Sequence, residues 1–194
     1  MIRILFVDDE HELLEIGKCF LETHPDFVVD TIQSARQALI LLKKYPYDVI
    51  ISDYLMPEMD GLLFLKKAHE VRPDIPFIFF TGQGEEKTVI EALNSGAEYY
   101  LKKNYEAGSQ FLELSQLIKI SVSRARSEKS IRENENTFRK IADFSPDWTY
   151  WMGPDSSLFY VSPSCEKITG YTQEEFFSDP TIIDRIVHPD DRKL

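Results

Sequence analysis

The chain has 194 residues, which is enough for one large domain or for an ordinary domain followed by a smaller one. Its 33 acidic residues outnumber its 22 basic ones, and the resulting formal net charge of −11 argues against direct contact with nucleic acid or with an anionic membrane surface. The two distant cysteines, Cys19 and Cys165, exclude a disulfide framework and a structural zinc site, and neither a signal peptide nor a membrane span is expected, so we expect a cytoplasmic protein.

Up to about residue 125, short apolar runs alternate with longer helical patterns, and the alternation repeats five times. This pattern predicts an α/β fold. Three of the runs are continuously apolar, as expected for parallel strands with helices on both faces. We therefore predict a doubly wound, five-stranded parallel sheet, with strands at Ile2–Val7, Phe27–Ile32, Val49–Ser52, Phe77–Thr81 and Glu98–Leu101 and helices at Glu10–Thr23, Ser34–Tyr45, Gly61–Val71, Glu85–Ser95 and Ser109–Arg126.

Local signals mark two of these helix ends. Ser34 followed by Gln37 is typical of a capping box and predicts the start of the second helix. Gly96 suits the left-handed cap that ends the fourth helix.

Residues 126–140 are predicted to form a helical linker. The surrounding stretch Ser121–Lys140 contains no proline or glycine and is rich in charged and polar residues, as in a solvated helix. Two interpretations remain open, a two-stranded coiled coil and a single amphipathic helix that leans on its neighbours. The heptad positions are Leu117, Ile120, Arg124, Ser127, Ile131, Asn134, Phe138 and Ile141.

The residue composition changes again from Phe144 onward. Two aromatic runs, Trp148–Met152 and Leu158–Val161, flank the turn-forming Gly153, Pro154 and Asp155 and predict a hairpin. Short helices are expected at Ser164–Ile168 and Gln173–Phe177, with Gly170 between them. This third region, residues 141–194, is 54 residues long, near the lower limit for an independent core.

Acidic side chains follow two strands of the predicted sheet. Asp8 and Asp9 come at the end of the first strand, and Asp53 comes at the end of the third. With the strand order 2-1-3-4-5 these strands are neighbours at the point where the order reverses, which is where such sheets bind ligands. Carboxylates this close destabilise one another unless a cation neutralises them, and an all-oxygen site favours Mg²⁺.

The predicted site has the groups that phosphoryl chemistry needs. Beside a metal ion, one of the carboxylates can attack phosphorus and form an aspartyl phosphate. Two further strand ends supply the hydroxyl of Thr81 and the ammonium of Lys102 or Lys103, which can hold phosphoryl oxygens.

Taken together, these motifs resemble the receiver domain of two-component response regulators, which has a flavodoxin-like fold. The resemblance covers residues 1–125. It rests on Leu5-Phe6-Val7-Asp8-Asp9-Glu10, on Asp53-Tyr54-Leu55-Met56-Pro57-Glu58-Met59-Asp60-Gly61, on Phe79-Phe80-Thr81-Gly82 and on Gly96-Ala97-Glu98-Tyr99-Tyr100-Leu101-Lys102-Lys103.

The resemblance implies that Asp53 is the phosphoacceptor. The donor would be a phosphohistidine of a sensor histidine kinase or of a phosphotransfer protein. Mg²⁺ would be held by Asp8, Asp9, Asp53 and the backbone carbonyl of Leu55.

The resemblance also assigns a switch. Thr81 and Lys103 would bind the phosphoryl group, and Tyr100 would turn inward with Thr81; Lys103 is preferred to Lys102 because of its position after the fifth strand. Asn104 stands where the family usually has proline, so we expect a trans peptide bond there.

The C-terminal region resembles the first part of a PAS sensory domain, an α+β fold, and we expect it to be truncated. The resemblance rests on Thr137–Ile141, Ser145-Pro146-Asp147, Phe159–Ser164, Ile168-Thr169-Gly170-Tyr171 and His188-Pro189-Asp190-Asp191-Arg192.

We therefore expect a response regulator that relays phosphorylation of Asp53 to a PAS-containing output, as a phosphoacceptor module and not as an enzyme. One alternative is a degenerate receiver that acts by contact alone. The other is a metal-dependent phosphohydrolase, a class that needs a second aspartate where Leu55 stands. Expected partners are the kinase or phosphotransfer protein and a second copy, bound through the fourth and fifth helices of the receiver or through the linker; nucleic acid and membrane are not expected.

Overall fold

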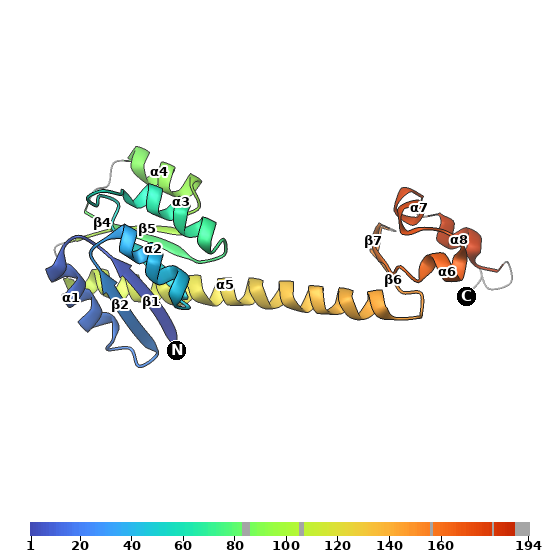
Figure 1. Ribbon diagram of the computed structural model, residues 1–194, viewed down its shortest axis with the longest axis horizontal. Helices are drawn as coiled ribbons and strands as arrows, with labels where there is room; N and C mark the ends of the chain where they lie inside the picture. Colours follow the sequence, from blue (N-terminus) through green and yellow to red (C-terminus); the bar gives the residue numbers. More distant parts are fainter. Residues whose placement is uncertain (83–85, 105–106, 156, 180, 189–194) are drawn as a thin grey trace. The chain divides into compact units, whose positions relative to one another are not determined.

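A computed structural model describes residues 1–82, 86–104, 107–155, 157–179 and 181–188 (Figure 1). The chain divides into two compact units, Met1–Glu128 and Lys129–Leu194. Glu128, the last residue of the first unit, falls inside the predicted linker. Within the described ranges, no helix is both long enough and apolar enough to cross a membrane.

The first unit is built on a five-stranded parallel sheet in the order β2-β1-β3-β4-β5, so the predicted strand order is confirmed. The elements agree closely with the sequence-based prediction, although β5 is one residue later than expected and the fifth helix, predicted at Ser109–Arg126, begins earlier and continues as one helix through the predicted linker to Phe144. Glu85, the predicted start of the fourth helix, lies outside the described residues. The elements are β1 Ile2–Val7, α1 His11–Leu21, β2 Phe27–Ile32, α2 Ala35–Lys44, β3 Val49–Ser52, α3 Gly61–Val71, β4 Phe77–Thr81, α4 Glu86–Asn94, β5 Tyr99–Lys102 and α5 Ala107–Phe144.

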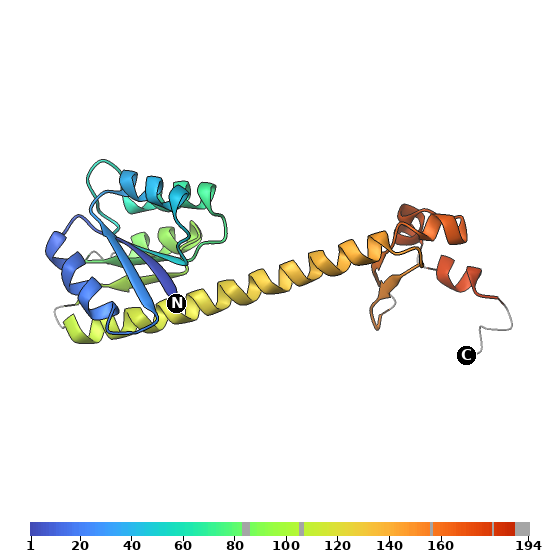
Figure 2. The same cartoon turned by 60° about the horizontal axis from the view of Figure 1, so that its bottom comes forward.

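Helices cover both faces of this sheet, α2, α3 and α4 on one side and α1 and the first part of α5 on the other (Figures 1 and 2). Because side chains alternate along a strand, β1 supplies both cores. Leu5 and Val7 are buried on the α2 and α3 side, while Ile4 and Phe6 are buried on the α1 and α5 side. The buried strands explain the continuously apolar runs in the sequence.

The first part of α5 buries a different row of residues from the predicted heptad. Phe111, Leu114, Ile118 and Val122 follow helical spacing and pack into the core on the α1 side of the sheet. This packing against neighbouring elements is that of an amphipathic helix, and Ile120 of the predicted seam is 53% exposed. Ile131, Phe138 and Ile141, in the other unit, are also exposed.

The second unit contains the end of α5 and a short antiparallel hairpin. Its strands are β6 Tyr150–Met152 and β7 Leu158–Val161, so the predicted hairpin is confirmed with a first strand two residues shorter. Two of its helices, α6 Cys165–Thr169 and α7 Gln173–Ser178, match predicted ones, and α8 Ile182–Ile186 does not. Its core consists of Val161, Cys165, Phe176, Ile182 and Ile183.

One of the two predicted helix caps is confirmed and the other is wrong. Gly96, which follows α4, has a φ of 101° and so adopts the predicted left-handed conformation. Ser34 occupies the N-cap of α2 with extended backbone, but its side chain accepts no capping hydrogen bond, so the predicted capping box is wrong. A capping box forms instead at α7, where the Thr172 side chain accepts from the Glu175 backbone N–H and the Glu175 carboxylate accepts from the Thr172 backbone N–H.

Candidate functional site

The carboxyl ends of β1, β3, β4 and β5 meet at one edge of the sheet and carry the predicted site residues. Backbone hydrogen bonds continue past the ends of the strands and fix these residues in place. The Asp53 N–H donates to the Val7 carbonyl at 2.9 Å, and the Lys103 N–H donates to the Thr81 carbonyl at 2.8 Å. The parallel sheet therefore brings together residues that are far apart in the sequence.

Lys103 lies at the centre of the acidic group. Its Nζ atom is 2.9 Å from Asp8 Oδ2, 3.1 Å from Glu10 Oε1 and 3.3 Å from Asp53 Oδ2. The Lys103 side chain is only 12% exposed, whereas Lys102 is exposed. The structure thus brings Lys103, and not Lys102, to the carboxylates.

The carboxylates that come together are those of Asp8, Glu10 and Asp53, each offering an oxygen atom within 4.8 Å of the others. Glu10, which was not among the predicted site residues, is the third member of this group. The Asp9 side chain is exposed, and its backbone carbonyl accepts a hydrogen bond from Gln33 Nε2 at 3.1 Å. The metal role of Asp9 remains a prediction. The only sequence signal for Glu10 is its place at the end of the Val-Asp-Asp-Glu run.

Burial and charge act against each other in this group. Burial raises the pKa of the Asp8 carboxyl from its ordinary 3.8 to about 6, although the hydrogen bond and charge of Lys103 act to lower it. Burial acts to lower the pKa of the Lys103 ammonium, but the hydrogen bond and charge of Asp8 and the charge of Asp53 outweigh it and raise that pKa. One ammonium therefore compensates the buried Asp8 charge only in part.

Asp53 is buried at the end of β3, and its two carboxylate oxygens have different partners. Oδ1 accepts the Tyr54 backbone N–H at 2.7 Å, and Oδ2 lies near Lys103. The following loop folds back so closely that the Gly61 N–H donates to the Tyr54 carbonyl at 2.7 Å. Leu55, whose backbone carbonyl was the predicted metal ligand, lies in this loop with an exposed side chain.

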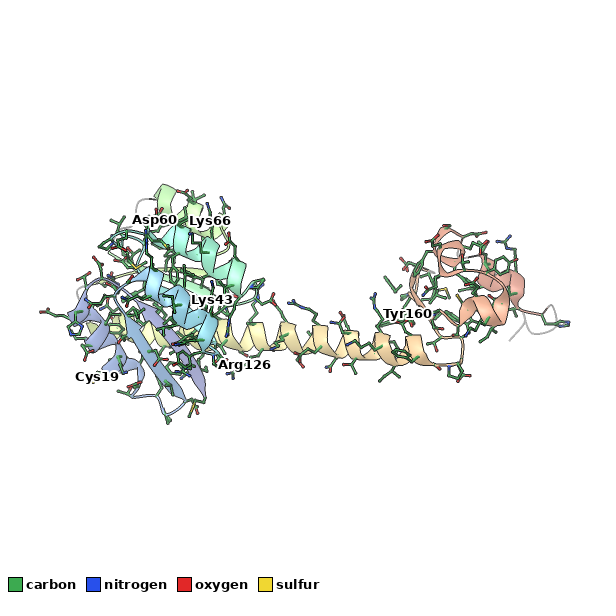
Figure 3. The ribbon with its side chains drawn as sticks, in the orientation of Figure 1. Cys19, Lys43, Asp60, Lys66, Arg126 and Tyr160 are labelled. Carbon is green, nitrogen blue, oxygen red and sulfur yellow. The ribbon has the colours of Figure 1, made fainter. Side chains whose placement is uncertain are left out.

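The loop ends at a capped helix. The Asp60 carboxylate accepts the Leu63 backbone N–H at 2.7 Å and begins α3 (Figure 3). This cap fixes the far end of the segment that carries Asp53.

Thr81 and Tyr100 lie on adjacent strands. Thr81 is buried at the end of β4, and Tyr100 is half-buried on β5, where its ring centroid is 6.2 Å from that of Phe79. Tyr100 packs into the same core as Tyr54, whereas Tyr99 packs into the core on the opposite face of the sheet. Of the two adjacent tyrosines, Tyr100 is therefore the one that shares a face with the segment after Asp53.

Asn104 follows Lys103 at the position where the resembled family usually has proline, and its peptide bond is trans. No cis peptide bond occurs in the described ranges, which include Asn104. The Asn104 N–H donates to the buried Gln110 side chain at 2.8 Å, a bond that proline could not make.

The donor set fits a hard divalent cation. Carboxylate oxygens are the ligands that Mg²⁺ prefers, and three carboxylates face a single ammonium here. The raised pKa of Asp8 shows that the buried negative charge is not fully compensated by the protein alone. A cation at this point would relieve that cost.

Comparison with known proteins agrees with this arrangement. Residues 4–114 match the family model of the response regulator receiver domain, and residues 158–194 match that of the PAS fold. Response regulator SaeR of Staphylococcus epidermidis is 27% identical over 212 residues, covering 100% of this chain and 90% of that protein. SaeR of Staphylococcus aureus is 25% identical, with the same coverage.

Solved receiver domains share the fold of the first unit. One from Methanospirillum hungatei is 28% identical with a TM-score of 0.60, and covers 66% of this chain and 98% of that chain. One from Clostridium thermocellum is 30% identical with a TM-score of 0.59, and covers 65% and 98%. The beryllofluoride-activated receiver domain dimer of NtrC4 is 31% identical with a TM-score of 0.58, and covers 64% and 99%.

Proposed function

The chain belongs to the response regulator receiver family, and on that basis we propose that Asp53 accepts a phosphoryl group from a phosphohistidine in a Mg²⁺-dependent reaction. The observation that carries the proposal is the position of Lys103, whose ammonium lies within 3.3 Å of both the Asp8 and the Asp53 carboxylates. The donor is a sensor histidine kinase or a phosphotransfer protein.

The reaction exchanges one bond to phosphorus for another. An Asp53 carboxylate oxygen attacks the phosphorus atom, and the P–N bond of the phosphohistidine breaks. The bonding electron pair goes to the imidazole nitrogen, which takes up a proton as the imidazole leaves. In a separate second step, water attacks the phosphorus atom of the aspartyl phosphate, the bond between phosphorus and the Asp53 oxygen breaks, and inorganic phosphate leaves, which ends the signal. The domain is then an acceptor with self-dephosphorylation chemistry and not an enzyme for external esters.

The residues around Asp53 have different roles in the proposed phosphoryl transfer. The backbone N–H of Tyr54, which donates to Asp53 Oδ1, orients the carboxylate so that Oδ2 faces the incoming group. Lys103 and the Thr81 hydroxyl stabilise the phosphoryl oxygens. Asp8 and Asp53, with Asp9 and the Leu55 carbonyl, would hold Mg²⁺. When bound, that ion supplies positive charge that offsets the negative charge on the transferring group.

Phosphorylation is then relayed along the sheet. Thr81 moves toward the phosphoryl group, and Tyr100 turns into the space beside it. The change alters the face formed by α4, β5 and α5, which is the surface we propose for partners or for a second copy of the chain. Helix α5 leads from this face to the PAS region, and its exposed Ile131 and Ile141 support pairing of the linker with a second copy.

The test is the intact mass of the chain after incubation with Mg²⁺ and a small-molecule phosphodonor such as acetyl phosphate. We expect the mass of one added phosphoryl group on the wild type, and no addition on Asp53→Ala or in the presence of a chelator. Absence of the adduct from the wild type would favour a degenerate receiver that acts by contact alone. Continuous hydrolysis of an added phosphate ester would favour an enzyme.

A further inference from the structure

The Glu10 side chain contacts the Lys103 ammonium and does not cap helix α1, which Glu10 precedes. It is the N-cap residue of α1, yet its side chain makes no capping hydrogen bond. Its carboxylate extends instead to Lys103, with Oε1 3.1 Å from Nζ. The backbone N–H of Glu10 donates to Asp8 Oδ1 at 3.0 Å, which fixes the point from which the side chain extends.

Three carboxylates surround the Lys103 ammonium. Nζ donates hydrogen bonds to Glu10 and Asp53 at 3.1 and 3.3 Å and forms an ion pair with Asp8 Oδ2 at 2.9 Å. An ammonium has three N–H donors, so a phosphoryl oxygen that binds Nζ competes with these carboxylates for it.

The three partners differ in how easily they can leave. Asp8 is fully buried, and Asp53 is the residue that carries the phosphoryl group. The Glu10 side chain is 65% exposed, so its carboxylate can turn into water with little loss of solvation. Glu10 is therefore the contact that can be released when the phosphoryl group arrives.

We propose that Glu10 is a positioning residue that holds the Lys103 ammonium in the resting site and competes with the phosphoryl group for it. This inference rests on the proposed phosphorylation of Asp53. Release of the Glu10 contact is part of the cost of phosphorylation, and removal of Glu10 lowers that cost.

The experiment measures the affinity for beryllofluoride, an analogue of the phosphoryl group, at saturating Mg²⁺. Glu10→Ala is compared with the wild type and with Glu12→Ala, which removes the same charge from an exposed residue in the first turn of α1. We expect Glu10→Ala to bind beryllofluoride up to about fivefold more tightly, the range of a partly exposed ion pair, and Glu12→Ala to match the wild type.

A third variant separates contact from charge. Glu10→Asp keeps the charge but is one methylene shorter, and at an N-cap position its carboxylate turns toward the helix N–H groups. We expect it to behave like Glu10→Ala. Wild-type affinity in Glu10→Asp would show that charge alone matters and would overturn the proposal.

Two other outcomes also decide the question. Equal affinities of Glu10→Ala and Glu12→Ala, with clear binding to the wild type, would overturn the role of Glu10 and leave the proposed function intact. No binding to the wild type would overturn the proposed function and this inference with it. Calorimetric titration with Mg²⁺ alone completes the test, because a loss of both Mg²⁺ and beryllofluoride affinity in Glu10→Ala would make Glu10 a metal ligand instead.

Discussion

Gly61 lies directly against the backbone of Asp53: a Cβ atom at Gly61 would be 2.4 Å from the Asp53 carbonyl oxygen. It would also be 2.7 Å from the Phe79 ring and 2.9 Å from the Tyr54 Cα atom. No rotation of a flexible side chain relieves the contacts with backbone atoms. The glycine is therefore required by the close approach of α3 to the segment that carries the proposed phosphoacceptor.

Gly61→Ala is expected to destabilise the fold and to slow phosphorylation of Asp53. Either the backbone of Asp53 or the start of α3 must shift, and such overpacking costs about 1–3 kcal/mol of unfolding free energy. Urea unfolding and the rate of adduct formation measure the two effects. Gly108→Ala is the matched control, because a Cβ there meets no atom within 4 Å. Equal stabilities of the two variants would contradict the close approach seen here.

Asp8→Asn is expected to stabilise the metal-free protein at neutral pH. The pKa of Asp8 is raised from 3.8 to about 6, so the folded protein holds this proton more tightly than the unfolded chain. The stability that this group contributes therefore falls as the pH rises from about 3.8 to about 6. The difference of about 2 in pKa corresponds to about 3 kcal/mol at pH 7.

The measurement is urea unfolding of the wild type and Asp8→Asn at pH 4 and at pH 7, with a chelator present. We expect Asp8→Asn to raise the free energy of unfolding strongly at pH 7 and only slightly at pH 4. A gain that does not depend on pH would show that the ionisation of Asp8 is not its source.

Mg²⁺ is expected to stabilise the wild type and not Asp8→Asn. An ion that binds only the folded state adds about 1.4 kcal/mol to the unfolding free energy at ten times its Kd. Thermal unfolding with increasing Mg²⁺ measures the effect, and Ca²⁺ at equal ionic strength tests whether the site selects the smaller ion. An equal rise in melting temperature for both proteins would place the bound ion elsewhere.

Arg126 is expected to hold α5 against the amino edge of the sheet (Figure 3). Its guanidinium donates to Asp48 Oδ1 at 2.9 Å and to the Met1 carbonyl at 3.0 Å. Because the Arg126 and Asp48 side chains are both partly exposed, Arg126→Ala should lower the free energy of unfolding by up to about 1 kcal/mol. The loss should be smaller at high salt. Asp48→Ala should cost more, since Asp48 Oδ2 also accepts the Arg3 backbone N–H at 2.8 Å. A double-mutant cycle in low and high salt measures the coupling, and a coupling of zero at low salt would contradict this role.

The sequence is sufficient to predict the sheet and the proximity of Asp8, Asp53 and Lys103. Buried parallel strands have a clear apolar signature, and the strand order places their carboxyl ends together. The position of Glu10 is not predictable in this way. Its contact with Lys103 depends on the direction of a long side chain that was free to cap a helix instead.

The spacing of apolar residues alone could not predict which face of α5 is buried and which is exposed. The heptad through Leu117 and Ile120 and the core row through Ile118 and Val122 overlap on one helix, and only tertiary packing selects the second row. The capping box of α7 has the Thr-x-x-Glu signature in Thr172 and Glu175 and is readable from the sequence, whereas Ser34 and Gln37 show that the same type of signature does not always form the box.

The positions of the site residues along the chain imply an order of assembly during synthesis. The ribosome delivers both buried carboxylates, Asp8 and Asp53, well before Lys103, which follows the last strand of the sheet. A nascent chain that has paired only its first four strands holds this negative charge without its counter-charge. Docking of β5 completes the edge of the sheet and brings the Lys103 ammonium to these carboxylates in the same event, so the partial compensation of their charge depends on the last strand to be made.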